Sequence, residues 1–203
     1  ILKYSKFWQN LVGPDGEVSS NYGDKIFWAN GDLLDPDSQF EKVAALLAAD
    51  PDSRRAIINI HTPESSSKNL KDVPCTLTLQ FFIREGQLHL SVNMRSNDLV
   101  LGFCNDVFQF TMIQELMLRR LQLFRNLCAL KLGGYHHHAG SMHVYEDKYE
   151  MVQAEVEEEP SLIPDFPNTM APMPTFDSVE GAVFVQSIEI VPGEMTITIR
   201  LPG

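Results

Sequence analysis

The chain has 203 residues, of which 44% are hydrophobic and 21% are charged, and its formal net charge at pH 7 is −11. This length and composition predict one soluble globular domain over residues 1–203 with a sizeable core. The acidic balance argues against non-specific nucleic-acid binding, and no apolar run is long enough to predict a membrane span.

Three cysteines, Cys75, Cys104 and Cys128, are an odd and sparse set that argues against a disulfide framework. They indicate a reducing compartment, so we expect a cytoplasmic protein. Cys104 and Cys128 are expected in the core, where free cysteine is common. Polar residues over 3–6 interrupt the first apolar residues and argue against a signal peptide there.

The first clear element is a helix over about residues 35–50. Ser38 and Glu41 have the spacing of a capping box, and apolar residues follow at helical intervals. These apolar positions are Phe40, Val43, Ala44 and Leu47. Next, the run Ala56–Ile60 has the composition of a strand buried on both faces.

Two alternating runs, Thr76–Ile83 and Gln87–Met94, flank the turn at Glu85-Gly86 and predict a β-hairpin. In the first run Leu77, Leu79 and Phe81 are expected to share one face of the strand. In the second run the shared face carries Leu88, Leu90 and Val92.

A long, mostly buried helix is predicted over about residues 106–130, ending at Gly133-Gly134. Its apolar positions recur at three and four residues and are Val107, Phe110, Ile113, Met117, Leu121, Phe124 and Cys128. A polar helix is expected near residues 146–157, then a proline-rich irregular connection over 160–174. Two strands are predicted near the end, over residues 183–191 and 194–201.

Cys75 is the first candidate for chemistry, since it follows a proline at the head of a predicted strand. A lone cysteine is usually a small buried hydrophobe, whereas a nucleophilic thiolate needs a cationic neighbour. Arg95 is placed to be that neighbour across the two strands. The residues alone leave both interpretations open.

Two other polar groups have alternative interpretations. The adjacent histidines His136–His138 point in different directions and lack a second ligand cluster, so we expect a solvated loop or a tag-like accident and no metal site. Arg54-Arg55 is either a solvated pair or an anion clamp, and Arg95-Ser96 could hold the same anion. The alternation His143-Val144-Tyr145 would place two hydrogen-bonding side chains on one face of an extended segment.

Several short motifs occur in order between about Trp8 and Tyr145 and resemble the thymidylate synthase family, which includes the cytidylate hydroxymethylases. They are Trp8 with Tyr22-Gly23, Asp50-Pro51-Asp52-Ser53-Arg54-Arg55, Pro74-Cys75, Arg95-Ser96-Asn97-Asp98 with Leu101-Gly102, and His143-Val144-Tyr145. The resemblance implies an α+β fold in which a long buried helix packs on a mixed β-sheet. It also implies that the sheet's other face forms a homodimer interface.

The resemblance implies a role for each matching residue. Cys75 would be the nucleophile that adds to C6 of a pyrimidine ring. Arg95 and Ser96 would bind the phosphate of the nucleotide, and Arg54 and Arg55 would reach the phosphate of the nucleotide in the partner subunit. His143 and Tyr145 would bind the sugar. Asp98 would contact the nucleotide and the folate, and Trp8 would contact the folate and the base.

Three departures from the family pattern carry information. Asp106 stands where thymidylate synthases have the asparagine that pairs with uracil, and a carboxylate suits a base with an exocyclic amine. Thr76 replaces the histidine expected after the nucleophile, and Met94 replaces the glutamine expected before Arg95. The family's N-terminal segment, with its arginine loop and catalytic glutamate, is not in the sequence, which begins at Ile1. We expect truncation or disorder of this segment; its true absence could leave the polypeptide inactive.

The predicted function is folate-dependent C5 hydroxymethylation of CMP or dCMP, with Cys75 and Asp106 as catalytic residues and 5,10-methylenetetrahydrofolate as co-substrate. The first alternative is a thymidylate synthase acting on dUMP. A second is a non-catalytic nucleotide-binding relative, and a third is a metal-binding protein that uses His136–His138.

Overall fold

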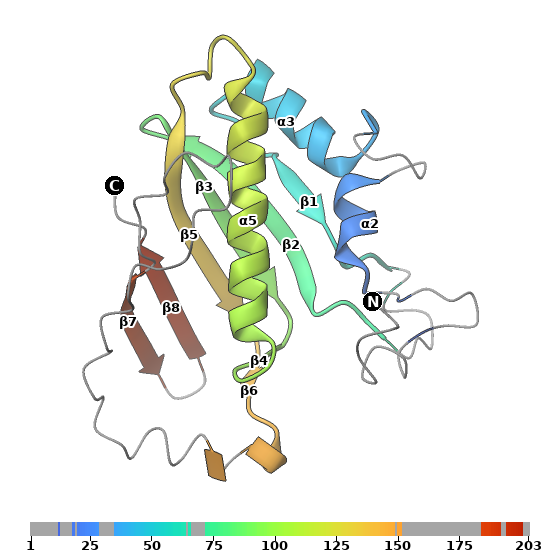
Figure 1. Ribbon diagram of the computed structural model, residues 1–203, viewed down its shortest axis with the longest axis vertical. Helices are drawn as coiled ribbons and strands as arrows, with labels where there is room; N and C mark the ends of the chain where they lie inside the picture. Colours follow the sequence, from blue (N-terminus) through green and yellow to red (C-terminus); the bar gives the residue numbers. More distant parts are fainter. Residues whose placement is uncertain are drawn as a thin grey trace, which may run out of the picture.

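The computed structural model describes residues 12, 18, 20–28, 35–63, 65, 72–148 and 150–151, and the backbone of residues 184–191 and 194–200. In this part of the chain, helices cover one face of a mixed sheet (Figure 1). The large sheet has the strand order β1-β2-β3-β5-β8-β7, and a small second sheet pairs β4 with β6. The predicted α+β class is confirmed.

The large sheet is built from β1 (Ile57–Asn59), β2 (Thr76–Arg84), β3 (Gln87–Met94), β5 (Lys131–Ala139), β7 (Phe184–Val191) and β8 (Glu194–Arg200). The small sheet is built from β4 (Asn97–Asp98) and β6 (Met142–His143). The described helices are α2 (Tyr22–Phe27), α3 (Gln39–Ala49), α5 (Phe103–Gln122) and the 3-10 helix η1 (Glu146–Lys148).

The predicted hairpin is the antiparallel pair β2–β3. Arg84 pairs with Gln87, so Glu85 and Gly86 form a two-residue loop. Their φ angles of 52° and 72° are those of a type I′ turn, whose twist matches the strands. Strand β3 then pairs in parallel with β5, and β5 pairs antiparallel with β8. The two late strands predicted near the end are therefore β7 and β8.

One face of the hairpin packs into the core, mostly as the alternation predicts. The expected residues Leu88, Leu90 and Val92 of β3 are buried. On β2 the buried apolar residues are Leu79, Phe81 and Ile83. The placement of Leu77 on this face is wrong, because the register shifts between Thr76 and Thr78 and leaves Leu77 only half-buried.

The prediction that Ala56–Ile60 is buried on both faces is wrong. Ile58 is fully buried, whereas Ile57 is 38% exposed and Asn59 is exposed. Strand β1 lies at the end of the sheet order, and the helices α2 and α3 contact it from one side. An apolar run alone does not reveal whether the second face of its strand is covered.

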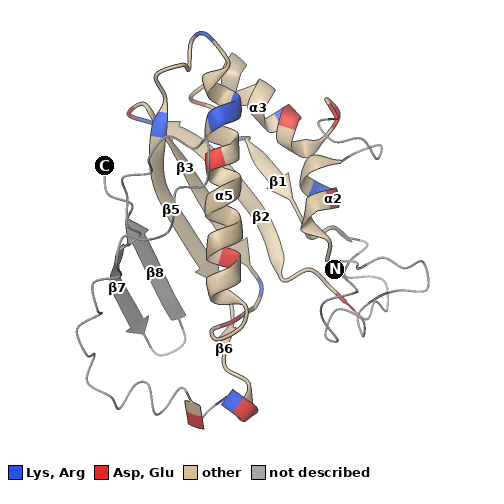
Figure 2. Ribbon diagram, in the orientation of Figure 1, with Lys and Arg blue, Asp and Glu red and all other residues tan. Residues whose placement is uncertain are grey.

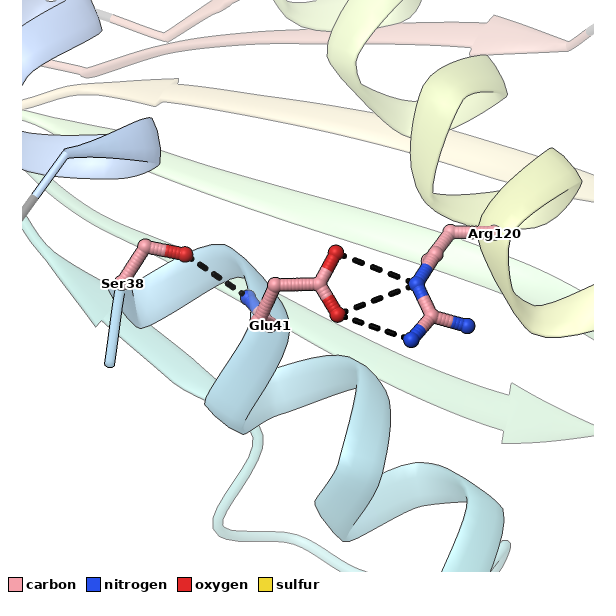
Figure 3. A network of polar contacts seen from close by, with 3 residues as sticks. All are labelled: Ser38, Glu41 and Arg120. Carbon is pink, nitrogen blue, oxygen red and sulfur yellow. Dashed lines mark hydrogen bonds and ion pairs between the residues drawn. The ribbon is translucent and has the colours of Figure 1, made fainter. Parts of the chain in front are cut away.

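Helix α3 begins as its capping signal predicts, and the four expected apolar residues Phe40, Val43, Ala44 and Leu47 are buried. The Ser38 hydroxyl accepts a hydrogen bond from the Glu41 backbone N–H at 3.2 Å. The Glu41 carboxylate turns to α5, where it accepts from Arg120 Nε at 3.0 Å and Nη2 at 2.8 Å (Figure 3). Of the two capping-box residues, Ser38 therefore caps α3, whereas the side chain of Glu41 links α3 to α5.

Helix α5 ends at Gln122 rather than near residue 130, and Gly133-Gly134 lies inside β5. The prediction that these glycines stop the helix is wrong for a steric reason. A Cβ at Gly133 would come within 2.9 Å of the His89 ring and of the Leu88 carbonyl on β3. Glycine is needed here because β5 approaches β3 closely. Gln114 of α5 donates to the Leu88 and Gly133 carbonyls across this contact.

Helix α5 buries one side only. The expected positions Phe110, Ile113, Met117 and Leu121 are buried, whereas Phe108 is 67% exposed. The placement of Cys104 and Cys128 in the core is wrong, since both are exposed in the isolated chain. The charges of α5 follow the helix dipole, with acidic positions nearer its start and basic ones at its end (Figure 2).

Two predicted segments are described only in part or not at all. Of the polar helix expected near residues 146–157, the structure describes η1 and residues 150–151. The connection over residues 160–174 lies outside the described residues. Within the described ranges, no helix combines the length and the apolar character needed to cross a membrane.

Candidate active site

Several segments meet at one end of the sheet, where β2 starts, β3 ends and α5 begins (the lower end of the helix in Figure 1). Cys75 directly precedes β2, and its carbonyl accepts a hydrogen bond at 2.8 Å from the backbone N–H of Arg95, just after β3. The small sheet, β4 with β6, adds Asp98 beside His143. Residues far apart in the sequence therefore line one region.

Arg95 contacts the thiol of Cys75, with its Nη2 atom 3.7 Å from Sγ. The same guanidinium donates to the carbonyls of Pro74 and Val73 at 3.1 and 3.0 Å, which fixes its plane beside the sulfur. The predicted cationic neighbour is thus present. Burial nevertheless raises the pKa of Cys75, Arg95 opposes that rise, and the carboxylates of Asp106 and Asp72 add to it. The free site therefore holds a protonated thiol at neutral pH.

Asp106 lies in the first turn of α5 and is half-buried. Burial raises the pKa of this carboxyl to about 6. Its charge acts on Cys75, on Tyr22 from α2 and on Tyr135 from β5. The neighbouring Asn105 is exposed and donates to the Leu101 carbonyl at 2.7 Å. Of the two residues, Asp106 is the one whose side chain is coupled to the thiol.

Tyr22 is a site residue to which the sequence analysis gave no role. Its hydroxyl accepts a hydrogen bond from the backbone N–H of Thr76 at 3.2 Å, and its ring stacks on Phe110 at 6.2 Å. Burial raises its pKa, so the hydroxyl stays protonated. The signal that marked it was the Tyr22-Gly23 motif, which lies 53 positions before Cys75 in the sequence.

Thr76 stands next to Cys75, where the family pattern has histidine. Its side chain is fully buried, and its hydroxyl has no hydrogen-bond partner among the described residues. A buried hydroxyl without a partner costs free energy, since it has lost its hydrogen bonds to water. Thr76 therefore fills the space beside the thiol without adding a general base.

A second group of predicted residues lies around the small sheet. The Ser96 hydroxyl is 3.4 Å from His143 Nδ1, and the rings of His143 and Tyr145 meet edge to face with centroids 5.0 Å apart. This ring contact agrees with the expectation that His143 and Tyr145 share one face of the segment. The Asp98 carboxylate accepts from the backbone N–H groups of Val100 and Leu101, so it also holds the loop before α5.

The structure does not bring Arg54 and Arg55 to the thiol of their own chain. Both are exposed and precede β1, which runs antiparallel to β2 with Ile57 opposite Gln80. With a rise of about 3.3 Å per strand residue, the two arginines lie about 20 Å along β2 from Cys75. Trp8, predicted to contact folate and base, lies outside the described residues.

The histidine run is a strand, so its placement in a solvated loop is wrong. All three residues belong to β5, where His137 is buried and His136 and His138 are exposed. His137 lies between Tyr135 and Asn97 in a hydrogen-bonded row. Within the described residues, no group of three metal-ligating side chains is found. Three consecutive histidines in a strand must alternate between faces, which is the signal that the sequence offered.

A thiol beside a guanidinium, with a half-buried carboxyl in the same region, is an arrangement suited to covalent attack by cysteine. Comparison with known proteins gives the family. Residues 2–189 match the family model described as thymidylate synthase. The chain therefore belongs to the thymidylate synthase family, as its motifs suggested.

Similar proteins within this family include enzymes with different names. The deoxycytidylate 5-hydroxymethyltransferase of Enterobacteria phage T4 is 33% identical over 151 residues, covering 72% of this chain and 59% of that protein. The deoxyuridylate hydroxymethyltransferase of Bacillus phage SP01 is 34% identical over 157 residues, covering 73% of this chain and 39% of that protein. The solved thermostable thymidylate synthase A from Bacillus subtilis matches with a TM-score of 0.60 and 26% identity over 78% of this chain and 54% of its own. The chain thus spans little more than half of the phage T4 protein.

Proposed function

We propose that this protein is a one-carbon transferase that hydroxymethylates C5 of a cytidine monophosphate, CMP or dCMP. The observation that carries the proposal is the half-buried carboxyl of Asp106 in the first turn of α5, at the end of the sheet where Arg95 contacts the thiol of Cys75. The similar phage T4 protein is named a deoxycytidylate 5-hydroxymethyltransferase, which supports the same substrate class.

Cys75 acts as the nucleophile. Its thiolate adds to C6 of the pyrimidine, which gives C5 the electron density to attack a one-carbon unit. C5 would attack the methylene carbon of the co-substrate 5,10-methylenetetrahydrofolate, and loss of the C5 proton and of tetrahydrofolate would leave an exocyclic methylene group. Addition of water to that methylene, with release of the Cys75 thiolate from C6, gives the hydroxymethyl product. Burial raises the pKa of the free thiol, and Arg95 opposes that rise. Arg95, which contacts the sulfur, then stabilises the charge as it develops.

Asp106 selects the base. Above its pKa of about 6 the carboxylate is ionised and accepts a hydrogen bond from the exocyclic amine of cytosine. Uracil presents a carbonyl at the same ring position, which faces an ionised carboxylate unfavourably. The raised pKa of Asp106 also favours a second candidate function, because a protonated Asp106 can donate a hydrogen bond to the uracil carbonyl. Methylation of dUMP by a thymidylate synthase is therefore the alternative, and the phage SP01 relative is named for deoxyuridylate.

The remaining predicted residues bind the nucleotide and the folate. Arg95 and Ser96 hold the phosphate, His143 and Tyr145 bind the sugar, and Asp98 lies between nucleotide and folate. The contact of Ser96 with His143 supports a shared site for phosphate and sugar. Trp8 is proposed to line the folate site.

The proposal includes a homodimer in a reducing, cytoplasmic compartment. The side of the sheet away from α5 carries half-exposed or exposed side chains such as Phe82, His89 and His136. A second copy packed on this face would bring its own Arg54 and Arg55 toward the first copy's phosphate. Their separation from Cys75 within one chain supports that division of labour.

The test is release of tritium from C5 of [5-³H]-CMP, -dCMP and -dUMP by the full-length protein, with and without methylenetetrahydrofolate. Release from a cytidine nucleotide that is lost in Cys75→Ala supports the proposal. Release from dUMP alone, with dihydrofolate as product, replaces it with thymidylate synthase. Nucleotide binding that survives Cys75→Ala without any turnover in the wild type identifies a binding protein.

The dimer is tested by mixing two inactive proteins, Cys75→Ala and Arg54→Ala/Arg55→Ala. If each site takes its arginines from the partner, a mixed dimer contains one intact site and activity returns. No return of activity after subunit exchange, shown by mass spectrometry of the mixed dimer, contradicts the shared site.

A further inference from the structure

The residues proposed to bind phosphate and sugar meet across a very short strand pair. In this pair, β4 with β6, Asp98 lies opposite His143. A ladder of two residues fixes its own register only weakly, and a slip of one residue would turn each side chain to the other face. The contact of Ser96 Oγ with His143 Nδ1 at 3.4 Å depends on that register. A further interaction is therefore needed to hold the segment in place.

Asn97 is the buried residue of this segment. Its side chain is 3% exposed, whereas Arg95 is exposed and Ser96 and Asp98 are half-buried. The backbone N–H of Asn97 donates to the Ser141 carbonyl at 2.8 Å, just before β6. The side chain of Asn97 extends from the same residue into the core, so its contacts bear directly on where the flanking residues lie.

The Asn97 amide is held in one orientation. Its Nδ2 atom lies 2.9 Å from His137 Nε2 and 3.3 Å from Met94 Sδ, and both accept because an amide nitrogen can only donate. On the other side, a Cβ at Gly102 would come within 2.6 Å of Asn97 Oδ1. The start of α5 therefore approaches the amide oxygen as closely as glycine allows, and the amide has no spare room there.

The acceptor for this amide is fixed on the large sheet. Burial, and to a lesser extent His138, lowers the pKa of His137 to about 4, so the ring is neutral. Since Nε2 accepts from Asn97, the ring proton is on Nδ1, which donates to Tyr135 Oη at 2.7 Å. His137 and Tyr135 both belong to β5, which pairs with β3 on one side and β8 on the other. The row from Asn97 through His137 to Tyr135 thus ties the short segment to the sheet.

We propose that Asn97 is a positioning residue for nucleotide binding, whose amide, anchored on His137, fixes the register of residues 95–98 against β6 and so holds Arg95 and Ser96 in place relative to His143. The inference rests on the part of the proposed function in which these three residues bind phosphate and sugar. It is independent of the base. Loss of the anchor should therefore weaken the binding of dCMP and of dUMP by the same factor.

Three variants separate the hydrogen bond from the space that it fills. Asn97→Leu keeps a side chain of similar size and removes the amide. His137→Leu removes the acceptor, whereas His137→Gln keeps an acceptor oxygen for the Asn97 amide. Gln114→Met is the matched control, because Gln114 is a fully buried amide that also donates to carbonyls of β3 and β5. It lies about three helical turns along α5 from Gly102, away from the row.

The readout is the dissociation constant of dCMP and of dUMP, measured by isothermal titration calorimetry on the full-length protein well below the unfolding temperature of each variant. A variant that is merely less stable binds at fewer sites per chain with an unchanged dissociation constant. We expect Asn97→Leu and His137→Leu to raise both constants on the order of tenfold, since the site must then be ordered by the ligand. His137→Gln and Gln114→Met should bind as the wild type does.

Unchanged constants in both leucine variants overturn the inference, and so does a rise in His137→Gln equal to that in His137→Leu. A rise for dCMP alone also overturns it, because the row would then act on the base. If Asn97→Leu does not fold, the comparison of His137→Leu with His137→Gln decides. A wild type that binds nucleotide but releases no tritium refutes the proposed reaction and leaves this test valid, whereas a wild type that binds neither nucleotide refutes both.

Discussion

Replacement of Asp106 by asparagine is the perturbation that isolates base selection. The carboxylate accepts a hydrogen bond from the cytosine amine, whereas an asparagine amide presents its NH₂ or a weaker carbonyl acceptor. Loss of one charge-assisted hydrogen bond costs about 1.5–3 kcal/mol. At 25 °C this lowers kcat/KM for a cytidine nucleotide on the order of 10- to 100-fold. The same change favours dUMP, because the amide can donate to O4 of uracil.

The wild-type pH dependence provides the second half of this prediction. Because burial raises the pKa of Asp106 to about 6, and the ionised form suits cytosine whereas the protonated form suits uracil, the ratio of dCMP to dUMP activity should fall about tenfold for each unit by which the pH is lowered through this range. Taking the ratio cancels groups such as Cys75 that act on both substrates. In Asp106→Asn the ratio should be low and independent of pH between 5 and 9.

The assay is tritium release from the two 5-³H nucleotides over that pH range. Asn105→Ala is the matched control, because Asn105 is adjacent but exposed and donates to the Leu101 carbonyl. It should keep the wild-type preference. If Asp106→Asn retains the preference for cytosine, or if Asn105→Ala loses it, the assignment of base selection to Asp106 is wrong.

Three further predictions concern stability. Thr76→Val should be neutral or raise the stability by up to about 1 kcal/mol, because it removes a buried hydroxyl that has no partner among the described residues; a clear fall in thermal midpoint would show that the hydroxyl is bonded. The Glu41–Arg120 ion pair, whose side chains are 14% and 32% exposed, should show a coupling energy of about 1 kcal/mol in a double-mutant cycle. The Asp37–Lys42 pair, whose side chains are 66% and 61% exposed, should show a few tenths of a kcal/mol at most. Equal coupling energies would contradict the role of burial. The third prediction concerns pH. Between about pH 6.5 and 4, His137 binds a proton in the unfolded state but not in the folded state, so it lowers the stability on acidification by at most about 3 kcal/mol. Asp106, whose pKa is raised in the folded state, has the opposite effect between about pH 6 and 4. Urea unfolding should therefore show a steeper acid loss in Asp106→Asn and a shallower one in His137→Phe, and identical slopes in both would refute this balance.

The local elements could be predicted where a short-range signal determines them. Ser38 begins a helix because its hydroxyl can bond an N–H three residues on, and Glu85-Gly86 turns a hairpin because both residues adopt positive φ. Alternation in β3 gave its buried face correctly. These signals depend on neighbours within a few residues, so the rest of the fold hardly alters them.

The errors arose where a distant element decides. Gly133 looked like a helix stop, but its freedom from a side chain serves the approach of β5 to His89. Leu77 is not on the predicted buried face, because the pairing of β2 with β3 shifts register between Thr76 and Thr78. Cys104 was expected in the core because of its type, but it lies on the uncovered side of α5.

The reactive residues of the candidate site could be predicted from the sequence, but the residues that pack around them could not. Cys75 and Arg95 could be paired from the hairpin geometry, and the structure puts them in contact. Tyr22 and the row of Asn97, His137 and Tyr135 were missed, because their relation to the site depends on how α2, β5 and α5 pack together. A histidine run gives no local sign of which member is buried.

The central claim is that Cys75 attacks C6 of a cytidine nucleotide, and a trapped adduct tests it most directly. Fluorine at C5 cannot be lost as the proton is, so 5-fluoro-dCMP with methylenetetrahydrofolate should leave the nucleotide attached to the enzyme. The account predicts an intact-mass increase equal to nucleotide plus folate, mapped by peptide analysis to Cys75 and absent in Cys75→Ala. An adduct on Cys104 or Cys128, or none under conditions where 5-fluoro-dUMP is trapped at Cys75, would contradict it.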